Sequence, residues 1–379
     1  MKSAPRLFTR LRSRGVLAVE GRDARKLLQG LVTSDVTKLD DGPQYTAFLS
    51  AQGRVLLDAF LVPAPEGGVL VDAERAALPS LAAHLKKYKL RSKAKMRDVS
   101  DELEVAAASG WPADGEDAGG AACDGGAWAD PRLPDVLGCR FLRPIGAPPP
   151  DWLASSTSVE EAADESLYDW VLMLLGLPNG SRHLPTNEAL PLESNIELLN
   201  GVSFAKGCYL GQELTARTHF RGVVRKRLVP VMDTERFERM QGQQSGGDGS
   251  DALGAGLSNL PEAERRLAAA LLAMRVEGAA DASLAAATGG AAAAAAAEEE
   301  GGGGEEEGEE GGGGRDTLRN AKGKKVGDLR SYDPSLGLGM ALCRLDAIGT
   351  SVERAAADQG GVVPPLTPLR PSWWPEEVG

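Results

Sequence analysis

The chain has few cysteines and no apolar run long enough to span a membrane. Its 379 residues include 4 cysteines and 3 histidines, and neither set has the short spacing that is typical of metal ligands. The scattered thiols disfavour a disulfide framework and the usual four-thiolate iron–sulfur site. We therefore expect no metal bound by this chain alone. We also expect no membrane partner, because no segment reaches the length of a bilayer-spanning helix.

The chain also lacks an excess of basic residues. Its formal net charge is −12, and the segment 298–310 contributes eight glutamates to it. Without those eight charges the net charge is −4, so the rest of the chain is only mildly acidic. Bulk nucleic-acid binding requires a net basic face. We therefore expect no nucleic-acid partner.

Length and pattern predict more than one domain. A chain of this length exceeds what one hydrophobic core usually supports. Strand-like and helix-like patterns interleave, which favours an α+β fold. Asp23 is placed to cap a helix, and Pro230 favours an edge strand or a strand start. The expected strands are 16–19, 45–49, 55–62, 69–71 and 223–232, and the expected helices are 74–92 and 159–177.

Two segments have unusual composition. Residues 241–320 alternate Gly-rich, Ala-rich and Glu-rich tracts, which cannot bury enough apolar surface to offset the ordering entropy. We predict a disordered insertion there, whose acidic run serves either as a solvated spacer or as a site for a basic partner. Residues 1–13 are basic and contain no acidic residue, which suits either a short transit segment or a simple basic tail.

Cys208 lies in the most informative motif. Residues 202–217 read VSFAKGCYLGQELTAR, in which a strand-like run precedes the cysteine and Gly211 opens a helix-like segment. A thiol before a helix start experiences the positive end of the helix dipole, and Lys206 adds a second positive charge. Both effects favour the thiolate. Alternatively, Cys208 is a small buried hydrophobe, and Glu213 and Arg217 form an ordinary helix-surface pair.

The segment 206–213, KGCYLGQE, resembles the signature of the YgfZ family of folate-binding proteins, relatives of the glycine-cleavage T-protein (aminomethyltransferase). The longer run 190–227 resembles the eukaryotic branch of that family, which contains mitochondrial iron–sulfur cluster assembly factors that act with A-type scaffold proteins. Further matches to the family lie at 15–24, 28–36, 53–58, 87–91, 326–327 and 337–341.

This resemblance implies an overall organisation. GcvT/YgfZ-like α+β domains are expected at 14–220, as one region or two subdomains. A C-terminal β-barrel domain, interrupted by the insertion, is expected at 221–379. The resemblance also implies a location in the mitochondrial matrix, with the chloroplast as the alternative.

The resemblance further implies a site. Cys208 would be a nucleophile or one ligand of a shared cluster, and Lys206 would tune its charge. Asp58 would handle the reacting nitrogen of tetrahydrofolate or a related folate. The alternative for Asp58 is a solvated or turn-capping carboxylate. The residues expected around the folate-like ligand are Arg54, Asp58, Gly207, Tyr209, Gly211, Gln212 and Glu213.

A cluster of basic residues lies at 86–97, within the expected α+β region 14–220. It could attract an anionic ligand such as a folate glutamate tail, or it could be a charged helix face and loop. Its members are Lys86, Lys87, Lys89, Arg91, Lys93, Lys95 and Arg97.

Three functions remain open from the sequence. We favour an accessory factor for iron–sulfur cluster assembly, which would bind the cluster in a complex with an A-type scaffold. The second is a tetrahydrofolate-dependent aminomethyl- or methyltransferase, supported by Asp58. The third is a binding module in which Cys208 is only structural. Whether the protein is an enzyme stays open.

Overall fold

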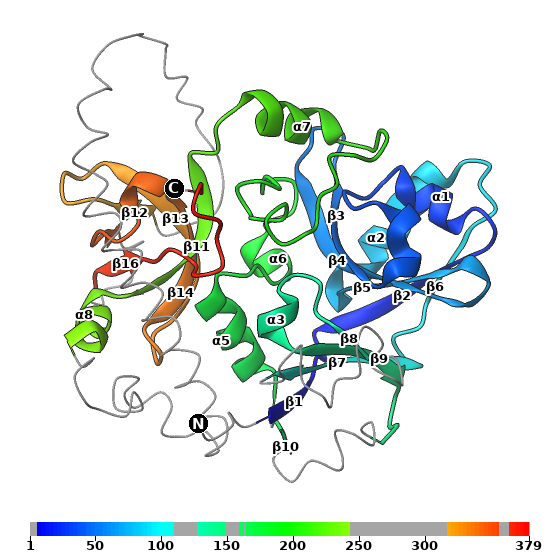
Figure 1. Ribbon diagram of the computed structural model, residues 1–379, viewed down its shortest axis with the longest axis horizontal. Helices are drawn as coiled ribbons and strands as arrows, with labels where there is room; N and C mark the ends of the chain where they lie inside the picture. The colour runs from blue at the N-terminus through cyan, green and yellow to red at the C-terminus, as the bar shows by residue number, and fades with distance from the viewer. Residues whose placement is uncertain are drawn as a thin grey trace. The chain divides into compact units, whose positions relative to one another are not determined.

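The computed structural model describes residues 6–109, 127–148, 159–162, 164–242, 317–355 and 364–378. These residues divide into two compact units (Figure 1). The first unit contains the described residues up to Leu172 and those from Leu177 to Arg227. The second contains Met173–Gly176 and the described residues from Leu228 onward. The boundary after Arg227 lies close to the predicted start of the C-terminal domain.

A five-stranded sheet with two helices on one face forms the first half of unit 1. Its strand order is β3-β4-β5-β2-β6, and all four neighbouring pairs are antiparallel. The predicted strands 16–19, 45–49, 55–62 and 69–71 are present, whereas the helix predicted at 74–92 is shorter at both ends and β6 was not predicted. The elements are β2 (Arg14–Glu20), α1 (Ala24–Gln29), η1 (Val36–Asp41), β3 (Gln44–Leu49), β4 (Val55–Pro63), η2 (Pro65–Gly67), β5 (Val69–Glu74), η3 (Arg75–Ala77), α2 (Leu78–Lys89) and β6 (Lys95–Asp98).

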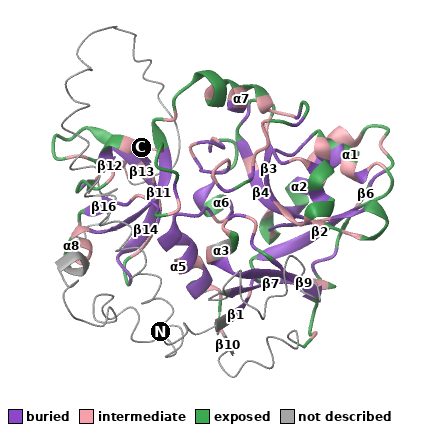
Figure 2. Cartoon of the chain, viewed as in Figure 1, coloured by how far each residue is buried: buried purple, intermediate pink, exposed green. Residues whose placement is uncertain are grey.

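Strand alternation gives this sheet two different faces. Leu57, Ala59 and Leu61 of β4 pack into the apolar core that α1 and α2 cover. Since successive side chains of a strand point to opposite faces, Asp58 and Phe60 lie on the other face. Both are nevertheless buried, because this second face is covered as well (Figure 2).

A second five-stranded sheet completes most of unit 1. Its order is β10-β1-β7-β9-β8. The short α3 lies between β8 and β9 in the chain, and α5, α6 and α7 follow the strands of this sheet. The elements are β1 (Arg6–Arg10), β7 (Leu103–Ser109), β8 (Ala127–Ala129), α3 (Pro134–Leu137), β9 (Cys139–Pro144), β10 (Val159–Glu161), α5 (Ser166–Leu175), α6 (Gly180–His183) and α7 (Gln212–Arg221).

Two expectations change in this sheet. The helix predicted at 159–177 is wrong at its start, because residues 159–161 form β10, parallel to β1, and α5 begins only at Ser166. Residues 6–10 of the basic N-terminal segment form β1, which has strand neighbours on both sides. That part of the segment therefore belongs to the folded sheet.

Unit 2 is built on a six-stranded sheet that nearly closes into a barrel. Its order is β15-β12-β13-β14-β11-β16, and an isolated bridge between Val352 and Leu366 joins its two edges. The predicted C-terminal barrel is therefore confirmed. Its elements are β11 (Lys226–Asp233), α8 (Thr234–Gly242), β12 (Thr317–Arg319), β13 (Lys325–Asp333), β14 (Leu338–Arg344), η5 (Leu345–Ala347), β15 (Glu353–Ala355) and β16 (Leu366–Pro368).

Two further corrections concern this barrel. The expectation that Pro230 lies on an edge strand is wrong, since β11 lies between β14 and β16. The pairing of β16 with β11 covers only Val231–Asp233. The Pro230 carbonyl accepts a hydrogen bond from the Leu369 amide, just beyond β16. The predicted disordered insertion was too long at both ends, because α8 extends to Gly242 and β12 starts at Thr317. Its remaining part lies outside the described residues.

Within the described ranges, no helix combines the length and apolar character that crossing a membrane requires.

Candidate functional site

The loop that carries Cys208 is held at its C-terminal end by two glycines. Gly211 has a φ of 78° and a left-handed conformation at the start of α7, which favours glycine. Gly53, in the turn between β3 and β4, has a φ of 80°. A Cβ on Gly53 would lie 2.9 Å from the Gly211 carbonyl oxygen, and one on Gly211 would overlap the Ser50 carbonyl. The two glycines therefore allow the turn and the loop to touch through their backbones.

Lys206 anchors the other end of this loop. Its buried ammonium donates hydrogen bonds to the carbonyls of Gln29, Val32 and Ser34 at 2.7–2.8 Å, so all three of its protons point to the end of α1 and the segment that follows it. Burial lowers the pKa of Lys206 to about 8, and the nearby Asp35 carboxylate opposes this shift. The structure thus gives Lys206 a positioning role, while its predicted effect on the Cys208 charge stays a prediction.

Cys208 itself is exposed, whereas Cys139 and Cys343 are buried. Burial raises the pKa of the Cys343 thiol to about 12. The space around Gly207 is open, since a Cβ there would meet nothing within 4 Å. The expectation that Cys208 follows a strand is wrong, because residues 202–207 form no strand, but the helix predicted after it is α7. Of the three cysteines in the described part of the chain, Cys208 is the one that a partner or a reagent can reach.

The neighbouring motif residues have distinct roles. Tyr209 is buried, and burial raises the pKa of its phenol to about 12. Gln212 accepts a hydrogen bond from the Tyr209 amide at 3.3 Å, which closes the loop onto α7. Glu213 is exposed and lies 3.9 Å from Arg217, as expected for the alternative of a helix-surface pair. Arg54 is exposed and donates to the Glu188 carbonyl, next to the Gly53 turn.

Asp58 lies in a second, buried environment. Its side chain is 2% exposed, which excludes the solvated carboxylate considered from the sequence. Its Oδ2 accepts a hydrogen bond from the Tyr45 hydroxyl at 3.2 Å, while Oδ1 has no hydrogen-bond partner among the described residues. Burial raises the Tyr45 pKa well above its usual value, so Tyr45 stays a proton donor to Asp58.

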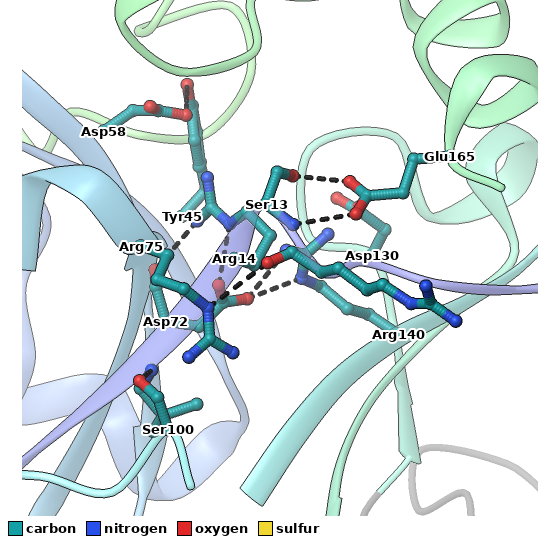
Figure 3. A network of polar contacts seen from close by, with 12 residues as sticks. Ser13, Arg14, Tyr45, Asp58, Asp72, Arg75, Ser100, Asp130, Arg140 and Glu165 are labelled. Carbon is teal, nitrogen blue, oxygen red and sulfur yellow. Dashed lines mark hydrogen bonds and ion pairs between the residues drawn. The ribbon is translucent and has the colours of Figure 1, made fainter.

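A network of charged side chains covers the same face of the sheet (Figure 3). Asp72 of β5 accepts hydrogen bonds from Arg14 of β2 and Arg140 of β9 at 2.8 Å each. Although burial lowers the pKa of Arg14, the carboxylates of Asp72 and Asp58 raise it above the usual value. The network therefore ties strands of both sheets of unit 1 to one buried carboxylate.

A second ion pair extends this network. Arg132 and Asp130 form a buried pair at 2.7 Å, and Arg132 also donates to the Tyr168 hydroxyl. The Phe60 ring lies 5.0 Å from the Arg132 guanidinium and 4.1 Å from that of Arg140. The sequence reasoning missed these residues. The available signal was the charged residue Asp72 directly after the apolar residues 69–71.

The structure thus separates the predicted site residues into two groups. Lys206, Gly207, Cys208 and Tyr209 lie in the loop before α7, and Gln212 is the first residue of α7. Asp58 lies on the buried face of the sheet, and no hydrogen bond joins it to that loop within the described residues. In the same residues, no group of three or more His, Cys, Asp or Glu side chains could hold a metal ion.

The comparisons with known proteins agree with this architecture. Residues 307–376 match the family described as the CAF17 C-terminal β-barrel domain. The fold resembles the crystal structure of the glycine cleavage system aminomethyltransferase T from Bartonella henselae with a TM-score of 0.59. That match covers 98% of this chain and 87% of that one at 14% identity, so it shows the fold alone. The chain therefore has an aminomethyltransferase-like fold that ends in a CAF17-type barrel.

Sequence comparison finds relatives with one shared description. The chain is 40% identical over 237 residues to the iron–sulfur cluster assembly factor IBA57 homologue, mitochondrial, of Mycosarcoma maydis, covering 58% of this chain and 55% of that protein. It is 37% identical over 245 residues to the homologue of Pyricularia oryzae, covering 63% and 61%. These matches confirm the GcvT/YgfZ-like resemblance, in the branch of the IBA57 homologues. The chain spans less than two thirds of the length of these relatives.

Proposed function

We propose that the chain is an accessory factor for the assembly of 4Fe–4S clusters in the mitochondrial matrix, and that it acts in a complex with an A-type scaffold protein. The relatives at 37–40% identity are named mitochondrial iron–sulfur cluster assembly factors, which supports both the process and the location. The observation that carries the proposal is the exposed thiol of Cys208 in an open, anchored loop.

The arrangement of the loop suits a shared cluster. A cluster is commonly held by four cysteine thiolates, and this loop offers one. The other ligands would come from the partner protein, so the cluster is cargo at an interface. An open site at Gly207 allows the partner backbone to approach the thiol without a Cβ in between. Lys206 and the Gly53–Gly211 contact would hold the loop in place while the partner binds.

The test is cluster uptake by the purified full chain mixed with an A-type scaffold that carries an iron–sulfur cluster. We expect the complex to show the visible absorption of a bound cluster, and Cys208→Ser to abolish it. Since Cys208 is exposed, the variant should melt at the wild-type temperature. Ser181→Ala, on a different exposed segment, is the control and should take up cluster normally. Uptake by Cys208→Ser equal to that of the wild type would remove the proposed role of the thiol.

A folate-like ligand is the second part of the proposal. A buried acceptor without a donor is costly, and Asp58 Oδ1 is such an atom. An N–H group of a tetrahydrofolate or related folate would satisfy it, so the residue present fits the ligand class. Tyr45 would keep the carboxylate oriented through its hydrogen bond to Oδ2.

Calorimetric titration with tetrahydrofolate checks this part. We expect binding by the wild type and at least about tenfold weaker binding by Asp58→Asn, because the amide offers one acceptor fewer. Arg54→Gln is compared with it, because Arg54 is the expected folate residue that lies exposed directly before the same strand. Absence of measurable binding by the wild type would refute the folate proposal and leave the cluster proposal standing. The transferase alternative rests on Asp58 and on the aminomethyltransferase-like fold, and the names of the relatives do not favour it.

A further inference from the structure

A cluster of cations surrounds one exposed leucine where α2 ends. α2 stops at Lys89, and the edge strand β6 begins at Lys95. Leu90 follows directly after the helix and is 88% exposed. Apart from Lys87, whose ammonium lies over the Tyr88 ring, five cations around it in sequence are exposed or half-buried. We call these five the α2–β6 cationic cluster; they are Lys86, Lys89, Arg91, Lys93 and Lys95.

The side chains of this cluster have no ion-pair partner within the described residues. No salt bridge is formed by any of its five members there. Two acids lie beside the cluster without pairing with its side chains. The Glu20 carboxylate lies 3.8 Å from Arg97, although Glu20 faces Lys95 across the ladder. Asp23 accepts a hydrogen bond from the Lys93 amide. A helix C-terminus attracts cations in its last turn, which accounts for Lys86 and Lys89 but not for those beyond the helix.

Leu90 occupies a backbone conformation that is unfavourable for its type. Its φ of 46° and ψ of −113° lie in a region that glycine adopts readily and that a side chain with a Cβ disfavours. The leucine therefore carries backbone strain and also exposes its side chain to water. Neither feature contributes to packing in the fold. An exposed apolar side chain among cations that form no ion pairs is typical of a segment that enters the boundary of an anionic bilayer.

We propose that this cluster is a peripheral binding site for the surface of an anionic phospholipid bilayer. Leu90 enters the boundary between headgroups and acyl chains, and the five cations contact the lipid phosphates. Such a contact needs no membrane-spanning helix. We expected no membrane partner because the sequence has no segment long enough to span a bilayer, and that argument does not apply to peripheral binding. Nucleic acid fits less well, because single strands are bound by exposed aromatic platforms. The local aromatic ring, Tyr88, packs against His84.

Vesicle co-sedimentation of the full chain tests this site. The probes are vesicles of phosphatidylcholine alone and of phosphatidylcholine with an equal amount of phosphatidylglycerol. We expect binding only to the anionic vesicles and a loss of binding as salt rises. Leu90→Gly removes the apolar tip and relieves the strained φ. Its partition should therefore fall about tenfold while its melting temperature stays equal or rises.

The charge variant is Lys89→Gln with Arg91→Gln, for which we expect about a fivefold loss for each cation removed. The matched control is Lys38→Gln with Lys322→Gln, two exposed lysines outside the cluster, with the same change in net charge and no expected loss. Equal losses in cluster and control variants would overturn the proposal, as would unchanged binding by Leu90→Gly. Tighter binding to a single-stranded oligonucleotide than to the anionic vesicles would assign the cluster to nucleic acid instead.

Discussion

At the scale of single residues, Lys206 determines where the Cys208 loop starts. Lys206→Met leaves three carbonyls without their donor, two of them in buried hydrogen bonds and one in a part-buried one, and each unsatisfied buried group is expensive. We expect the free energy of unfolding to fall by about 2–4 kcal/mol, measured by urea denaturation. Lys206→Arg keeps the charge and the donors, so it should lose less. Equal losses in the two variants would show that the hydrogen bonds do not anchor the loop.

The same residue gives a pH dependence. Burial lowers the folded-state pKa of Lys206 to about 8 from its usual 10.5, so between these values the unfolded chain binds more protons than the folded one. Stability contributed by this group therefore rises with pH across that window. The difference in unfolding free energy between wild type and Lys206→Met should be larger at about pH 10 than at about pH 7. A difference that shrinks with pH would contradict the lowered pKa.

Thiol exposure predicts a chemical selectivity at this scale. The thiolate is the species that reacts with iodoacetamide, and Cys208 is exposed while Cys139 and Cys343 are buried. Among these three, mass spectrometry of the native protein should find Cys208 modified first. Cys343, whose pKa burial raises to about 12, should react only after denaturation. Early modification of Cys343 would show that the barrel opens readily.

At the scale of elements, the contact between the β3–β4 turn and the start of α7 depends on glycine. Gly211→Ala combines a left-handed φ with an overlap at the Ser50 carbonyl, so we expect a loss of about 2–4 kcal/mol. Gly207→Ala, four residues earlier in the same loop, has open space and should cost under about 0.5 kcal/mol. Thermal unfolding of the two variants measures the difference, and equal destabilisation would remove the argument for this contact.

The elements also show what the sequence could predict. The alternation in β4 and the apolar spacing of α2 were sufficient to predict both, because each buries one regular face in the same core. The segment 159–165 was misjudged since its acidic, alanine-containing composition suits a helix, whereas pairing with β1 draws 159–161 into a strand. Asp23 does precede α1, but its carboxylate accepts from the Lys93 amide instead of capping the helix. Local pattern identified these elements, and distant partners set their ends.

The candidate site shows the same division. The Cys208 motif and Asp58 could be found from the sequence through a family resemblance and local chemistry. The burial of Asp58 could not, because it requires a second sheet to cover the far face of β4. The partners of Lys206 lie more than 170 residues away in the chain, and no local pattern indicates such a contact.

At the scale of the whole molecule, one carboxylate joins the two sheets of unit 1. Asp72 binds Arg14 from its own sheet and Arg140 from the other, and all three side chains are buried. A buried ion network is weak evidence for net stability, but removing one charge from it leaves the others uncompensated. Asp72→Asn would leave two buried guanidinium groups sharing a neutral partner. We therefore expect unit 1 to lose about 3–5 kcal/mol.

Urea denaturation followed by tryptophan fluorescence measures this loss, and Trp128 of β8 reports on the second sheet. Asp40→Asn is the matched control, since Asp40 forms an exposed pair with Arg25 and surface pairs contribute little. If Asp72 couples the sheets, the single transition should move to lower urea for Asp72→Asn while the control stays in place. A variant that unfolds at the wild-type midpoint would mean that apolar packing alone holds the sheets together, and that the network serves the environment of Asp58 instead.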